Sequence, residues 1–186
     1  MQNPFTTTFS KTPEYTYIHT EKTEEILENF IYDNPSESVY KITGVRGSGK
    51  TVILAKAGFG SQDKKTTGID EVSKSEEMVK FASEYGRWLR AGYPVYFVCT
   101  GLYENIQELS NVKNLTFFRR AATVKTEPLN MIRMTEMYKS KLDIDSDEAR
   151  EMAKITKGYT YAFQELGVLC FKKKAGESLK DILMNI

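Results

Sequence analysis

The stretch Gly44-Val45-Arg46-Gly47-Ser48-Gly49-Lys50-Thr51 decides how the rest of this chain is interpreted. It matches the pattern Gly-x4-Gly-Lys-Thr, whose glycines allow a backbone path in which successive N–H groups point at phosphate oxygens. In that pattern the side chain of Lys50 reaches the β- and γ-phosphates and assists catalysis, and the hydroxyl of Thr51 is a ligand of magnesium. We therefore predict that the whole stretch binds the phosphates of a nucleoside triphosphate, rather than being a chance glycine-rich turn.

The segments around this loop have the pattern that such a loop requires. Ser38–Thr43 reads as a strand, and Thr51–Ala57 begins a helix. Strands and helices alternate through the first part of the chain, and amphipathic helices alone follow. We predict an α/β fold, with a three-layer P-loop NTPase core around a parallel sheet and an N-terminal arm at residues 1–126. A C-terminal helical lid is predicted at residues 127–186.

A second candidate element is the acidic pair Asp70-Glu71. A P-loop enzyme needs an acid at the end of a neighbouring strand to hold the magnesium shell, so Asp70 is a candidate metal residue beside Thr51. Glu71 is the candidate catalytic base, because a glutamate in that place accepts a proton from the attacking water. A surface acidic pair is the alternative, because only Gly68 and Ile69 precede the acids where a buried strand supplies about four apolar residues.

A third candidate follows the strongly apolar segment Tyr93–Cys99, which is predicted to be a buried strand. Ligands of α/β sheets bind beyond the carboxyl ends of the strands. Thr100 is therefore placed to face the γ-phosphate or the attacking water. That Thr100 merely ends the strand is an equally good interpretation.

The composition is that of a soluble globular protein. Hydrophobic residues make up 40% and charged residues 27%, and a formal net charge of +1 does not draw the chain to nucleic acid or to an anionic membrane. No apolar run approaches the roughly 20 residues that cross a bilayer, and the first residues do not form a secretory signal. Cys99 and Cys170 lie in apolar segments and are expected to be free thiols, so we expect a cytoplasmic protein.

Several segments together resemble the AAA+-like ATP-binding proteins of bacteria and archaea, in the branch related to origin-recognition and signal-transduction (STAND) ATPases. Gly44–Thr51 resembles their Walker A motif, and Ile69–Val72 resembles Walker B. Other segments are similar to the family's N-terminal arm, its passage into the lid and its lid segment near the nucleotide: Asn3–Thr6, Phe118–Arg120 with Glu127–Leu129, and Lys157–Ala162. The resemblance implies that the ligand is ATP with Mg²⁺, and that the arm lies near the adenine.

The chain departs from this family between the two Walker motifs. The family has a much longer segment there, whereas Thr51 and Asp70 are only 19 positions apart. A parallel crossover alone needs about a dozen residues or more. We therefore expect that a segment around Gly58–Thr67 has been lost, and that a structure will show a break or a disordered connection within Gly58–Gly68. A degenerate NTPase with an incomplete core is the alternative.

The family also often places an arginine of the lid on the γ-phosphate, and Gly158-Tyr159-Thr160 offers none. Arg150 and Lys154 are weak substitutes for it. Arg119 and Arg120 are candidates for an arginine finger, acting on this chain's own site or on a neighbour's. A solvated basic pair is the favoured interpretation of these two residues.

Two main functions and one weaker one follow. The first is a probable ATPase, in which hydrolysis with Mg²⁺ switches the arrangement of core and lid. The second is a nucleotide-binding scaffold or sensor with little or no turnover. The third is a part of a nucleic-acid-associated assembly, and only kinship suggests it. A protein partner or an oligomer is compatible with the sequence, and a membrane is not expected.

Overall fold

The computed structural model of the chain describes residues 2–8, 12–21, 39–56, 65–113, 115–173 and 177–184. These residues belong to two compact units. The core unit spans Glu21–Glu127, and the helical unit combines Met1–Thr20 with Pro128–Ile186. In the sequence, therefore, the core unit is inserted between the two parts of the helical unit.

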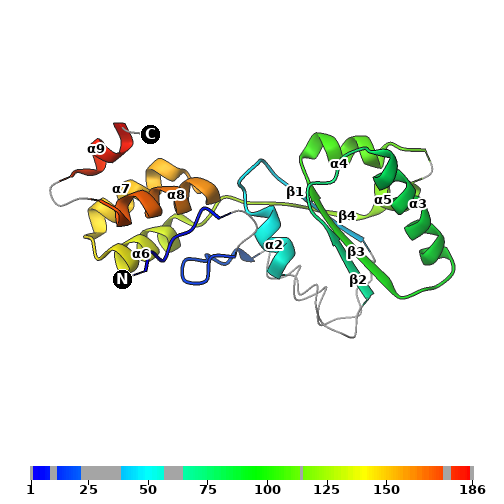
Figure 1. The fold of residues 1–186 in the computed structure, drawn as a ribbon, viewed down its shortest axis with the longest axis horizontal. Coiled ribbons are helices and arrows are strands. Elements are labelled where there is room, and N and C mark those ends of the chain that lie inside the picture. The colour runs from blue at the N-terminus through cyan, green and yellow to red at the C-terminus, as the bar shows by residue number, and fades with distance from the viewer. Residues whose placement is uncertain are drawn as a thin grey trace. The chain divides into compact units, whose positions relative to one another are not determined.

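The core unit contains a sheet of four parallel strands (Figure 1). The strands are β1 (Val39–Thr43), β2 (Lys65–Ile69), β3 (Val95–Gly101) and β4 (Ala122–Lys125), in the spatial order β2-β3-β1-β4. Because all four run in one direction, the segments that follow them meet at one edge of the sheet. The predicted α/β fold with a parallel sheet is confirmed.

Helices cover both faces of this sheet, as Figure 1 shows. Side chains of a strand point alternately to its two faces. Ile42 of β1 therefore packs on one face with Leu54 of α2 (Lys50–Lys56). Val39 of β1 belongs to a larger apolar cluster on the other face. That cluster is formed with α3 (Glu76–Arg90), α4 (Tyr103–Ser110) and α5 (Thr116–Arg120).

A lysine is buried within the larger cluster's face of the sheet. Lys41, in the middle of β1, is 4% exposed, and its Nζ donates a hydrogen bond to the backbone oxygen of Phe118 at 2.8 Å. The same Nζ lies 5.2 Å from the centre of the Phe118 ring. Burial lowers the pKa of Lys41. The cation sits at the C-terminal end of α5, where helix carbonyls lack partners and positive charge is favourable.

The helical unit is built from α6 (Met131–Leu142), α7 (Ser146–Thr156), α8 (Thr160–Phe171) and α9 (Leu179–Met184). Side-chain caps define where two of these helices begin. Asn130 accepts hydrogen bonds from the first backbone N–H groups of α6, and Asp145 does the same for α7. The side chains of Met134, Tyr138 and Phe163 are fully buried at the centre of the helical unit.

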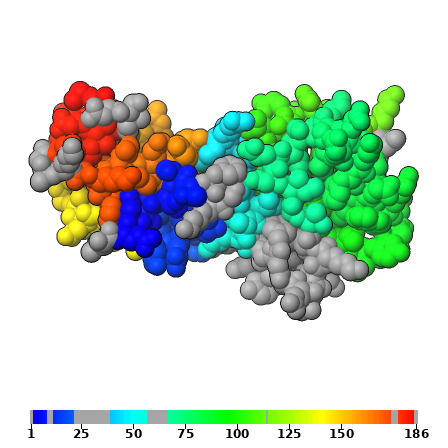
Figure 2. Space-filling view, in the orientation of Figure 1, coloured from blue at the N-terminus to red at the C-terminus, as the bar shows by residue number. Residues whose placement is uncertain are grey.

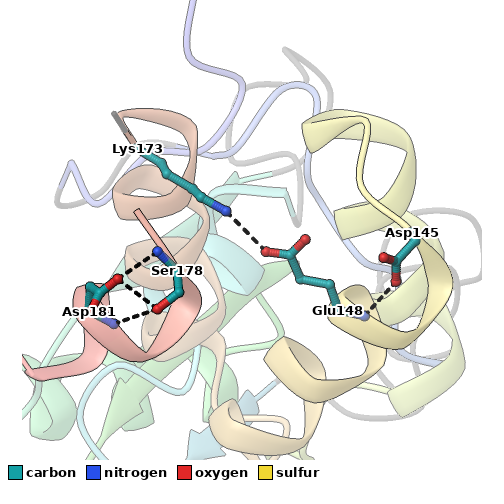
Figure 3. Close-up of polar contacts among 5 residues, drawn as sticks. All are labelled: Asp145, Glu148, Lys173, Ser178 and Asp181. Atoms are coloured by element: carbon teal, nitrogen blue, oxygen red, sulfur yellow. Dashed lines mark hydrogen bonds and ion pairs between the residues drawn. The ribbon is translucent and has the colours of Figure 1, made fainter. Parts of the chain in front are cut away.

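Figure 3 shows polar contacts in the later part of the helical unit. Lys173, just after α8, lies 3.3 Å from the carboxylate of Glu148 in α7. Asp181 accepts hydrogen bonds from both the N–H and the hydroxyl of Ser178, each at 2.7 Å. The N–H of Asp181 donates back to the Ser178 hydroxyl, so the pair forms a reciprocal cap at the start of α9.

The N-terminal arm packs on these helices. Phe5 is 3% exposed, and its ring lies 5.7 Å from that of Tyr138 and 5.8 Å from that of Phe163, between centroids. The buried Gln164 of α8 accepts hydrogen bonds from the Thr6 N–H and the Thr16 hydroxyl. Figure 2 shows the arm in blue against α8 in orange. The predicted grouping of this arm with the core at residues 1–126 therefore differs from the structure, in which Met1–Thr20 belongs to the helical unit.

The expected loss of a segment between the Walker motifs finds no support. Strand β2 begins at Lys65 and pairs with β3 along its whole length, so residues 65–68 of the expected gap form a continuous strand. The rest of that stretch, residues 58–64, lies outside the described residues. β2 is the edge strand of the described sheet, with Thr67 and Gly68 exposed, so the short apolar stretch before Asp70 does not argue against a strand there. An edge strand does not need the apolar run of a central parallel strand.

Among the helices that the structure describes, none has the length and apolar character needed to cross a membrane.

Candidate functional site

The predicted phosphate loop lies between β1 and α2, at the carboxyl edge of the sheet. Its backbone uses the freedom of glycine at two positions, since Gly47 has φ +70° and Gly49 has φ +89°. The Ser48 N–H donates to the Val45 carbonyl at 3.3 Å, which closes a turn. Val45, Arg46 and Gly47 are exposed at the tip of the loop.

Lys50 reaches back across this loop. Its side chain is buried, and its Nζ donates to the carbonyl oxygens of Gly44 and Val45, both at 2.9 Å. Burial lowers the pKa of Lys50, and the nearby carboxylates of Glu71 and Asp70 act in the opposite direction. The lysine therefore bridges the start of the loop in a place where both carboxylates favour its charged form.

The carboxylate of Asp70 accepts hydrogen bonds from two hydroxyl groups that belong to different elements. The Thr51 hydroxyl at the start of α2 donates to Oδ2 of Asp70 at 2.7 Å. The Thr100 hydroxyl in β3 donates to Oδ1. Residues of the two predicted motifs and the third candidate residue thus meet in one place, although they come from three different elements.

Glu71 has an unusual backbone conformation. Its φ is +50°, in the left-handed region that few residues other than glycine adopt. Its N–H donates to the Thr100 hydroxyl at 3.1 Å, and the next N–H, of Val72, donates to the Thr100 carbonyl at 2.8 Å. Such strain persists only where surrounding contacts enforce it, and it occurs often at functional sites. The side chain of Glu71 is left exposed beside the loop.

The structure does not bring Arg119 and Arg120 to this site. Both are exposed at the end of α5, and β4 begins directly after them, at Ala122. Because β4 runs parallel to β1, its start lies at the opposite edge of the sheet from the phosphate loop. This arrangement disfavours an arginine finger within the chain itself, and a role toward a neighbour stays a prediction.

Sequence reasoning missed one residue at the loop. Thr126, which follows β4, donates from its hydroxyl to that of Ser48 at 2.9 Å, and from its N–H to the Thr43 carbonyl at 2.8 Å. The only signal available was its place after a short possible strand. Its proximity to the loop depends on β4 pairing with β1, which spacing along the chain does not show.

Comparison with known proteins gives the fold but no family. No protein-family model matches the sequence, and no curated protein matches it. The chain is similar in structure to domain III of the replication initiation protein DnaA from Thermotoga maritima, with a TM-score of 0.67 and 14% sequence identity. The match covers 93% of this chain and 95% of that chain, so little of either is left without a counterpart. The chain therefore has an α/β fold similar to that of this domain.

Proposed function

We propose that this chain binds ATP with Mg²⁺ at Gly44–Thr51 and hydrolyses it with Glu71 as the general base. The observation that carries the proposal is the hydrogen bond of 2.7 Å between the Thr51 hydroxyl and Asp70. It joins the last residue of the phosphate-loop motif to the acid that a P-loop enzyme requires at the end of a neighbouring strand. The AAA+-like fold supports the same assignment.

The residues present fit a magnesium ion. The Thr51 hydroxyl donates a hydrogen bond to Asp70, so the lone pairs of its oxygen stay available to a cation. Among the described residues no group of three or more His, Cys, Asp and Glu side chains could hold a metal. Mg²⁺ does not need one, because it is commonly held by one or two protein oxygens, water and the phosphates of the substrate. Bound there with ATP, it would neutralise charge on the β- and γ-phosphates.

The proposed hydrolysis uses the exposed carboxylate of Glu71. That carboxylate takes a proton from a water molecule, whose oxygen attacks the γ-phosphorus while the bond to the β-phosphate oxygen breaks and ADP leaves. Thr100 fixes the backbone from which Glu71 projects, through hydrogen bonds at residues 71 and 72. Lys50 supplies positive charge to the phosphates, for which it must exchange carbonyl contacts within the loop.

In this proposal the nucleotide state sets the arrangement of the core and helical units. The chain joins them at two points, after Thr20 and after Glu127, so both connections take part in any change of arrangement. A role in a nucleic-acid-associated assembly rests on kinship alone and is not part of the proposal.

Substitution of Lys50 tests the binding step. Lys50→Ala should weaken ATP–Mg²⁺ affinity by about tenfold or more, because a charge-assisted contact is worth roughly 1.5–3 kcal/mol. Lys80→Ala, at an exposed lysine of α3, is the matched control and should bind like the wild type. Isothermal titration calorimetry measures all three proteins. Equal affinity in wild type and Lys50→Ala would remove the phosphate-loop assignment.

A specific observation favours the second function, nucleotide binding with little turnover. The Thr100 hydroxyl already donates to Asp70 and accepts from the Glu71 N–H, so its proton is not available to a phosphate or a water. Glu71→Gln separates the two functions. An ATPase should keep ATP binding and lose roughly 10²-fold or more in phosphate release, whereas Glu77→Gln in α3 should change neither. If the wild-type protein releases phosphate no faster than the background rate, the second function, a nucleotide-binding scaffold or sensor, is the correct one.

A further inference from the structure

Thr126 makes a contact with the phosphate loop that neither Walker motif accounts for. Its hydroxyl donates to the Ser48 hydroxyl at 2.9 Å, and its N–H donates to the Thr43 carbonyl at 2.8 Å. The parallel ladder between β1 and β4 runs up to the pair Thr43 and Lys125, so Thr126 continues it by one residue. The hydroxyl is therefore presented to the loop from the sheet, whose position is fixed.

Gly44 permits this close approach. A Cβ atom built on Gly44 would lie 2.0 Å from Oγ1 of Thr126, 3.1 Å from its Cβ and 2.5 Å from Oγ of Ser48. The β-branched side chain of Thr126 has restricted rotation about χ1, and its backbone is held by Thr43, so it cannot easily move aside. The absence of a side chain at Gly44 is thus what lets the two hydroxyls meet.

We propose that Thr126 is a positioning residue of the phosphate loop, which holds Ser48 and the neighbouring loop backbone in place before a nucleotide binds. This inference rests on the proposed function. A loop that is already ordered loses less conformational freedom on binding, so the contact raises nucleotide affinity without touching the nucleotide. Thr126 also lies one residue before the end of the core unit, so the same contact joins the loop to the point where the chain leaves the core.

Nucleotide titrations of hydroxyl variants test this role. Thr126→Val keeps the shape and removes the hydroxyl, and it should weaken ATP–Mg²⁺ affinity about three- to tenfold, the loss expected for one hydrogen bond. Thr126→Ser keeps the hydroxyl and should stay within about twofold of wild type. Thr123→Val, at an exposed position of β4, is the matched control and should have no effect. In a Ser48→Ala background, where the partner hydroxyl is gone, Thr126→Val should cause little further loss of affinity.

A measurement on the nucleotide-free protein distinguishes positioning of the loop from direct contact with the nucleotide. Amide hydrogen exchange at residues 44–51 of the free protein should be faster in Thr126→Val than in wild type, Thr126→Ser or Thr123→Val. Unchanged exchange and an ATP affinity within twofold of wild type in Thr126→Val would overturn the inference and leave the proposed function intact. A wild-type protein that does not bind ATP–Mg²⁺ would instead overturn the proposed function, and this inference with it.

Discussion

Replacement of Phe5 by alanine should greatly lower the free energy of unfolding of the helical unit. The ring of Phe5 is 3% exposed and packs against Tyr138 and Phe163, which lie at the centre of the unit. Truncation of a buried phenylalanine to alanine costs about 3–5 kcal/mol. A loss of this size is a large fraction of the stability of a small unit. Chemical denaturation combined with hydrogen exchange of the α6 and α8 amides measures the stability of the helical unit separately from that of the core unit.

Two further variants make this prediction specific. Tyr15→Ala changes an aromatic residue of the same arm that is 57% exposed, so it should shift stability by no more than about 0.5 kcal/mol. Gly167→Ala would place a Cβ 2.3 Å from the Phe5 ring, so it should destabilise the wild type but be tolerated in Phe5→Ala, which leaves room for it. A loss below about 1 kcal/mol for Phe5→Ala, with additive effects of the two substitutions, would refute the assignment of the arm to the helical unit.

Two predictions concern titratable groups. Burial lowers the pKa of Lys41 below its ordinary 10.5, so the charged form opposes folding at neutral pH, and the stability of wild type relative to Lys41→Met should rise as the pH increases toward 10.5. Urea unfolding at pH 7 and pH 10 measures that difference, and a constant value would contradict the burial of the charge. Backbone hydrogen bonds from residues 148 and 147 lower the pKa of Asp145 below its ordinary 3.8. The ionised Asp145 therefore stabilises the fold above that pH, and this stabilisation is lost as the pH falls further. Asp145→Ala should therefore be less stable than wild type in thermal unfolding at pH 7, with a smaller difference at pH 3, and equal stability at pH 7 would show that the cap is not needed.

The part of the site predicted from sequence is the part that short motifs specify. Gly44–Thr51 combines a particular backbone path with particular side chains within one turn, and its spacing is a direct consequence of that geometry. The approach of Asp70 to Thr51 follows because parallel strands end at one edge of the sheet. The structure brings these residues together, while their roles in binding and catalysis remain predictions.

The remaining features depend on pairing between distant segments. Thr126 reaches the loop because β4 lies next to β1, and Lys41 is buried because α5 ends over the middle of β1. The spacing of residues along the chain predicts neither of these two contacts between distant segments. The expected gap before Asp70 had another origin, because it rested on the longer segment between the Walker motifs of the family that the chain resembles, whereas residues 65–69 form strand β2. The packing of the arm also depends on distant segments, since Phe163, a partner of Phe5, is far away in sequence.

The magnesium dependence of ATP binding tests most directly the claim that the loop and Asp70 form one ATP–Mg²⁺ site. Calorimetric titration of ATP, with and without Mg²⁺, compares wild type with Asp70→Asn, which keeps the shape of the side chain and removes its charge. We predict that Mg²⁺ raises the ATP affinity of wild type by about tenfold or more, as one charge-assisted contact would, and that Asp70→Asn loses most of this gain. ATP binding by wild type that is equally tight with and without Mg²⁺, or a full magnesium effect in Asp70→Asn, would contradict the account.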